Sequence, residues 1–135
     1  MSFDLYLVCY ANQRPSGVPR SAILEAFGDQ VRWEDDYSGR THDRYCSIDL
    51  GRLKSEPDLI SCVSINRPLA DQRFLASLYK IMELDHGAFC VAMVFPGDKG
   101  PLVASLSAAS HLSEHLGQPI VVHNAAEILE QIESS

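Results

Sequence analysis

Four short apolar stretches, each rich in residues that favour β-strands, constrain the fold more than any other feature of this sequence. They cover residues 3–10, 59–65, 88–95 and 119–123. Each has the length of a strand and falls well short of the roughly 18 apolar residues of a membrane span. The stretch at 88–95 has no polar alternation, which indicates a strand covered on both faces. We therefore expect a sheet built from these stretches and no membrane segment.

Stretches with helical periodicity lie between and after these strands. The clearest covers residues 68–87, where one apolar stripe is formed by Phe74, Leu75, Leu78, Ile81 and Met82. Shorter helices are predicted at 21–28 and 102–116, and a last one after Asn124, whose side chain is expected to cap it.

The order of these elements predicts the fold class. Strands alternate with helices in the C-terminal half, which favours crossovers and a partly parallel arrangement. We predict an α/β or α+β fold with a mixed sheet of about five to six strands and three to four packed helices, while an antiparallel α+β sandwich stays open. Residues 31–50 predict a hairpin that turns at "SGR", residues 38–40. Because no linker or repeat interrupts the sequence, residues 1–135 are expected to form a single globular domain.

Charge narrows the class of partner. The chain has 11 Lys and Arg against 18 Asp and Glu, a formal net charge of −7. Affinity for nucleic acids comes largely from basic side chains that neutralise phosphates, so this balance argues against a nucleic-acid partner and favours a basic protein surface. Asp4 lies where a signal peptide carries positive charge, and we expect a cytoplasmic protein.

Motifs for catalysis, cofactors and metals are weak. The sequence has no phosphate-binding glycine pattern and no nucleophile elbow, and we expect no catalytic residue, no cofactor and no metal ion. Its four cysteines are widely spaced in apolar stretches, which is typical of small buried side chains. His111 and His115 belong to an H-x-x-E-H pattern like that of inverted zinc peptidases, but a helix end favourable for histidine is the simpler interpretation. The sequence leaves open whether these two histidines bind a metal.

One short segment combines the single tryptophan with three acids and a tyrosine. Its residues are Trp33, Glu34, Asp35, Asp36 and Tyr37. Aromatic and charged clusters of this type anchor protein interfaces, so we predict that these residues bind a protein partner with a basic surface. The alternative is a hairpin in which Trp33 faces the core and the acids keep a sheet edge soluble.

A second candidate site depends on strand order. If the strands at 59–65, 88–95 and 119–123 were parallel neighbours, their ends would meet at one edge of the sheet, where open α/β sheets bind ligands. The residues that would form this ligand site are Arg67, Arg73, Lys99 and His123. The loop from Pro96 to Pro101 could present backbone N–H groups to an anion there, although an ordinary strand-to-helix corner also explains its residues.

Three stretches carry a resemblance to known proteins: "FDLYLVCY", "INRPLADQRFLASLYKIM", and "FPGDKGPLVAS" with the closing helix. The chain resembles the small acidic immunity proteins of bacterial polymorphic toxin systems, and uncharacterised bacterial proteins of similar layout. This resemblance implies a non-enzymatic inhibitor that binds and neutralises a cognate toxin. We therefore predict a protein-binding domain, with self-association left open. The alternative is a small-molecule-binding regulator or enzyme that uses the sheet edge near Arg67, Lys99 and His123.

Overall fold

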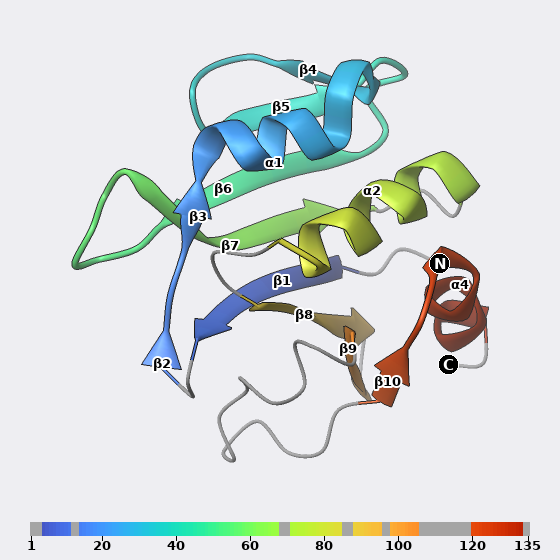
Figure 1. Ribbon diagram of the computed structural model, residues 1–135. Coiled ribbons are helices and arrows are strands. Elements are labelled where there is room, and N and C mark those ends of the chain that lie inside the picture. Colours follow the sequence, from blue (N-terminus) through green and yellow to red (C-terminus); the bar gives the residue numbers. More distant parts are fainter. Residues whose placement is uncertain are drawn as a thin grey trace.

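A computed structural model of the chain describes residues 4–11, 14–67, 71–84, 88–95, 98–105 and 120–133 (Figure 1). Within these ranges ten strands form one sheet in the order β10-β9-β8-β1-β7-β6-β5-β4, with β2 beside β1 and β3 beside β7. The strands are β1 (Asp4–Ala11), β2 (Arg14–Pro15), β3 (Val18–Pro19), β4 (Val31–Trp33), β5 (Ser38–Thr41), β6 (Ser47–Arg52), β7 (Leu59–Asn66), β8 (Ala88–Phe95), β9 (Asp98–Ser105) and β10 (Ile120–Val122). The helices are α1 (Arg20–Phe27), the 3-10 helix η1 (Gly28–Gln30), α2 (Gln72–Met82) and α4 (Ala125–Glu133).

The predicted fold class is confirmed as α+β. Neighbouring strands in the sheet are antiparallel, except that β10 runs parallel to β9. The strand count exceeds the prediction because the two-residue strands β2 and β3 were not predicted, β9 was predicted as a helix, and the segment predicted as a two-stranded hairpin forms three strands. Strands of two residues, such as β2 and β3, carry too few residues to show a periodicity in the sequence.

Helices α1 and α2 lie across one face of the sheet, and α2 contacts both α1 and α4 (Figure 1). The apolar stripe predicted for α2 is confirmed, because Phe74, Leu75, Leu78, Ile81 and Met82 are all buried in the core. On β1, Leu5 and Leu7 face this core while Tyr6 and Val8 are half-buried on the other face. No helix in the described part of the chain is both long and apolar enough to cross a membrane.

Local hydrogen bonds fix where the helices begin and end. Asp71 caps α2 by accepting a hydrogen bond from the Phe74 backbone N–H at 2.8 Å. Asn124 caps α4 as predicted, since its side-chain oxygen accepts from the Glu127 N–H at 3.0 Å. Helix α1 ends at Gly28, whose φ of 59° lies in the left-handed region that glycine adopts without strain.

The cysteines behave largely as predicted. Cys9 and Cys46 are buried in the core, and Cys62 is half-buried on β7. Burial raises the pKa of the Cys62 thiol, which disfavours the reactive thiolate. The side chain of Cys90 lies outside the described residues.

The predicted helix at 102–116 is wrong at its start, because residues 98–105 form strand β9 and pair antiparallel with β8. The register places Ala92 opposite Leu102 but Val94 opposite Lys99, so Gly100 and Pro101 together face one residue of β8. Proline cannot donate to a strand ladder, and a bulge of this kind accommodates it. The chain therefore reverses between β8 and β9 and does not enter a helix there. Residues 106–119, which include His111 and His115, lie outside the described ranges.

The hairpin predicted for residues 31–50 is a three-stranded meander with two turns. Strand β5 contains the "SGR" that was expected to form the turn, and the chain turns instead at 34–37 and 42–46. Asp35 explains the first turn, since one of its carboxylate oxygens accepts the N–H groups of Tyr37 at 2.8 Å and Ser38 at 2.7 Å.

Candidate binding site

The β4–β5 hairpin, residues 31–44, lies at one end of the sheet and carries the site. Strand β4 pairs only with β5 among the described residues, with Val31 opposite Thr41, Arg32 opposite Arg40 and Trp33 opposite Gly39. Because side chains alternate along a strand, Arg32 and Arg40 share the exposed face while Val31 and Thr41 share the buried one.

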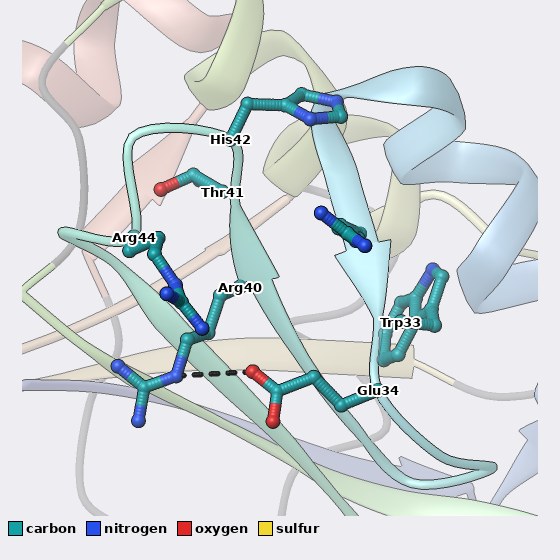
Figure 2. Close-up of a pocket in the computed structure, with 7 residues that line it drawn as sticks. Trp33, Glu34, Arg40, Thr41, His42 and Arg44 are labelled. Carbon is teal, nitrogen blue, oxygen red and sulfur yellow. Dashed lines mark ion pairs between the residues drawn. The ribbon is translucent and has the colours of Figure 1, made fainter.

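A cavity of about 620 Å³ opens on this hairpin (Figure 2). The residues that line it are Arg32, Trp33, Glu34, Arg40, Thr41, His42 and Arg44. Arg40 and Arg44 lie on the same side of β5, and Glu34 reaches back from β4 so that its carboxylate lies 3.2 Å from Arg40 Nε (Figure 2). Three cations and one acid therefore surround the cavity, in a chain whose net charge is strongly negative.

The turn after β5 holds Arg44 in place. Asp43 accepts hydrogen bonds from the Thr41 hydroxyl at 2.6 Å and from the Tyr45 N–H at 2.9 Å, and the Thr41 bond is the main reason that the pKa of Asp43 is lowered. Arg44 has a φ of 64°, a left-handed conformation that costs a non-glycine residue about 1 kcal/mol. Its N–H donates to the Thr41 carbonyl at 2.8 Å, which offsets part of that cost.

His42 closes the upper end of the cavity, next to the segment that precedes β4 (Figure 2). Its Nε2 donates to the Asp29 carbonyl oxygen at 2.6 Å, so this nitrogen carries a proton and the ring orientation is set by η1. The Asp29 carboxylate in turn pairs with Arg73 at the start of α2. The hairpin is thus tied through Asp29 to η1 and to the start of α2.

Comparisons of this chain with protein-family models, with curated proteins and with solved structures found no match.

The five predicted partner-binding residues all lie on this hairpin, but each has a local contact. Trp33 packs against the core, with its ring centroid 6.5 Å from that of Phe27, and it is only partly exposed. Glu34 pairs with Arg40, and Asp36 pairs with Arg20 at 3.9 Å.

The other two members of this group have structural roles as well. Asp35 caps its own turn. Tyr37 is half-buried, with the Arg52 guanidinium 4.7 Å from its ring centroid. The segment is therefore a well-ordered turn whose acids already have partners, and its role in binding stays a prediction.

The alternative ligand site is not assembled. Strand β1 lies between β7 and β8, so these strands are not neighbours, and β10 runs opposite to both. His123 consequently follows β10 at the opposite edge. The residue before it, Val122, pairs with Ser105, which is six residues or about 20 Å along β9 from Lys99. Arg67 and Lys99 leave the same edge but are three strands apart, about 14 Å.

The four residues of that alternative site also have separate surroundings. The Arg67 guanidinium lies 5.8 Å from the Tyr45 ring centroid, and Arg73 pairs with Asp29. His123 Nδ1 lies 3.2 Å from the Glu127 carboxylate, and the His123 backbone N–H is the main cause of the lowered pKa of Glu127. The side chain of Lys99 lies outside the described residues.

The cationic half of the cavity was not predicted from the sequence. The partner-binding prediction named the acids, the tryptophan and the tyrosine of residues 33–37, whereas the structure brings together Arg32, Arg40, His42 and Arg44. Three arginines within 13 residues of an acidic chain were a usable signal. Among the described residues there is no group of three His, Cys, Asp or Glu that could hold a metal ion.

Proposed function

We propose that the protein is a non-enzymatic protein-binding domain, an immunity-type inhibitor that binds and neutralises a bacterial toxin in the cytoplasm. The β4–β5 hairpin is the proposed binding surface. The observation that carries this proposal is the acidic turn of Glu34, Asp35 and Asp36, which is exposed on one hairpin at the end of the sheet, next to the partly buried Trp33.

Preorganisation of the turn supports a role in binding. Asp35 holds the turn with two hydrogen bonds, and Asp36 is tied to Arg20 on α1. A surface that is ordered before it meets its partner loses little conformational entropy on binding, which leaves more of the contact energy as affinity.

Glu34 and Asp36 can still leave their local arginines and pair with basic groups of a partner. The side chains of Glu34 and Asp36 are 52% and 82% exposed, and exposed ion pairs contribute only about 0–1 kcal/mol. A basic partner can therefore take over these carboxylates at little cost. The net charge of −7 also attracts a basic partner at long range and speeds its association.

The test compares two triple variants that lose the same charge. The hairpin variant is Glu34→Gln, Asp35→Asn and Asp36→Asn, in which the amide oxygen introduced at position 35 can still accept the two turn hydrogen bonds. A partner is first isolated by copurification with the tagged chain, and its association rate is then measured with purified proteins at several salt concentrations. We expect the hairpin variant to associate about tenfold more slowly at low salt and to show a weaker salt dependence.

The control variant neutralises three exposed acids elsewhere: Glu25→Gln, Glu56→Gln and Asp58→Asn. It should slow association by less than about threefold, because it changes the net charge without touching the hairpin. Equal effects in the two variants would refute the hairpin as the binding surface. A partner that keeps its full activity when saturated with the protein would refute the inhibitor.

A further inference from the structure

The exposed face of the β4–β5 hairpin places like charges opposite each other. Arg32 and Arg40 are direct cross-strand partners, and neither side chain is covered by the helical layer. Like charges in directly opposed positions destabilise a sheet. An anion bound between the two guanidinium groups would remove this penalty.

Arg44 adds positive charge and N–H donors to the same cavity, and His42 forms part of its wall. Arg44 is held beside Arg40 by the turn at Asp43, and His42 lines the cavity with a ring whose orientation is fixed by Asp29. Asp43 is not among the lining residues, and its carboxylate accepts hydrogen bonds from the Thr41 hydroxyl and the Tyr45 N–H.

We propose that this cavity binds the phosphoryl group of a small molecule, through Arg32, Arg40 and Arg44. Among the described lining residues Glu34 is the only acid, so three arginines and one glutamate leave two positive charges with histidine neutral. A phosphate monoester carries about −1.5 to −2 near neutral pH and matches this charge. This inference does not depend on the proposed inhibitor function.

The number of donors favours a phosphoryl group over a single carboxylate. Each guanidinium offers a planar fork of N–H donors, and three forks exceed the two oxygens of a carboxylate. A phosphate monoester presents three terminal oxygens, enough for each arginine to bind one. The cavity volume of about 620 Å³ leaves room for the rest of a small phosphorylated molecule.

Binding can be measured through the protein's own fluorescence, because Trp33 lines the cavity and is the only tryptophan of the chain. Inorganic phosphate, glycerol phosphate and acetate are each titrated at constant ionic strength. We expect a saturable change in Trp33 emission with both phosphates, and binding of acetate at least about tenfold weaker. Equal affinity for both phosphates assigns free phosphate as the ligand, and tighter binding of the ester assigns a phosphorylated molecule.

Four variants test the residues. Arg32→Gln and Arg44→Gln should each weaken phosphate binding by about fivefold or more, because each removes charge-assisted hydrogen bonds from a partly exposed site. Glu34→Gln should tighten it by about threefold or more, because it releases Arg40 and removes the opposing charge. The matched control Arg14→Gln loses one exposed arginine outside the cavity and should change affinity by less than about twofold.

Thermal unfolding of each variant shows that it is folded, since substitutions of exposed arginines normally change stability little. The proposal is overturned if neither phosphate gives a saturable response, or if acetate binds as tightly as phosphate. It is also overturned if Arg14→Gln weakens binding as much as Arg32→Gln does, or if Glu34→Gln fails to tighten it.

Discussion

Gly39→Ala is the sharpest test of how this hairpin is built. Gly39 lies opposite Trp33 on the buried face of β5, and an added Cβ would come within 2.7 Å of Val31 Cγ1 and 2.8 Å of Trp33 Cε3. Both distances are about 1 Å shorter than a comfortable carbon–carbon contact. The glycine therefore gives the tryptophan ring the space it needs to pack over β5.

The cost follows from the size of this clash. Overpacking a core by one methyl group typically destabilises a protein by about 1–3 kcal/mol, and the partly exposed ring of Trp33 can move outward, so we expect about 2 kcal/mol. With a urea m-value of about 1.5 kcal/mol/M, this loss lowers the unfolding midpoint by about 1.3 M. The emission of Trp33 should also shift to the red, because the displaced ring gains contact with water.

The control is Gly51→Ala, a change of the same size on β6. There the new Cβ would lie 3.3 Å from Cys62 Cβ and 3.6 Å from its carbonyl oxygen, contacts that a small shift relieves. We expect a change within about 0.5 kcal/mol and unchanged tryptophan emission. If Gly39→Ala were as stable as Gly51→Ala, with no shift in emission, the packing of Trp33 over β5 would be refuted.

Three further predictions concern the helices. Phe74→Ala should cost about 3–5 kcal/mol in urea unfolding, because the ring is fully buried and lies 5.8 Å from that of Phe27; a loss below about 1 kcal/mol would contradict its core position. The pKa of Glu127 is lowered from its ordinary value of 4.5 in the folded protein, so its contribution to stability is present above pH 4.5. This contribution is lost as the pH falls through the pKa of Glu127 in the folded protein. The loss of stability that Glu127→Gln causes at pH 7 should therefore become smaller in acid. A hydrogen bond with Glu83 raises the pKa of Tyr79 to about 12, so its contribution is present below about pH 10 and is lost as pH rises towards 12. The loss of unfolding free energy caused by Tyr79→Phe should accordingly be constant around neutral pH and become smaller in alkali. A loss that does not change with pH would contradict this hydrogen bond.

Elements whose burial is set by their own residues could be predicted from the sequence. The apolar residues between Phe74 and Met82 are spaced so that a helix brings them all to one face, and all five are buried in the core. Strands β7 and β8 likewise contain enough β-branched and aromatic residues to be predicted as strands, and their bounds agree with the prediction to within a residue.

The turns of the hairpin could not be placed in this way. Ser38 and Gly39 have the composition of a turn, but the glycine is needed to make room for Trp33 and belongs to a strand. The turn is fixed instead by Asp35, whose role depends on hydrogen bonds that composition does not reveal. Once the turn is misplaced, the register is lost, and with it the opposition of Arg32 and Arg40 that defines the cavity.

The order of the strands in the sheet could not be predicted from the sequence either, because it depends on pairing between residues far apart in the chain. The N-terminal strand β1 inserts between β7 and β8, with Leu7 opposite both Val63 and Val91. Nothing local in β7 or β8 indicates that another strand separates them. The prediction therefore put Arg67, Lys99 and His123 at one edge of the sheet. In the structure, the inserted strand β1 and the β8–β9 hairpin separate these residues between two edges.

Glu34 connects the two proposals made for the hairpin. It is one of the acids proposed to meet a basic partner, and it is also the acid that occupies Arg40. A partner that draws Glu34 away frees Arg40 for a phosphoryl group, and a bound phosphoryl group frees Glu34 for the partner. Coupling between two binding sites is reciprocal, so each ligand should raise the affinity of the other by the same factor. The Glu34→Gln variant should abolish that coupling while leaving the cavity able to bind phosphate, because the residue through which the two sites communicate is then uncharged.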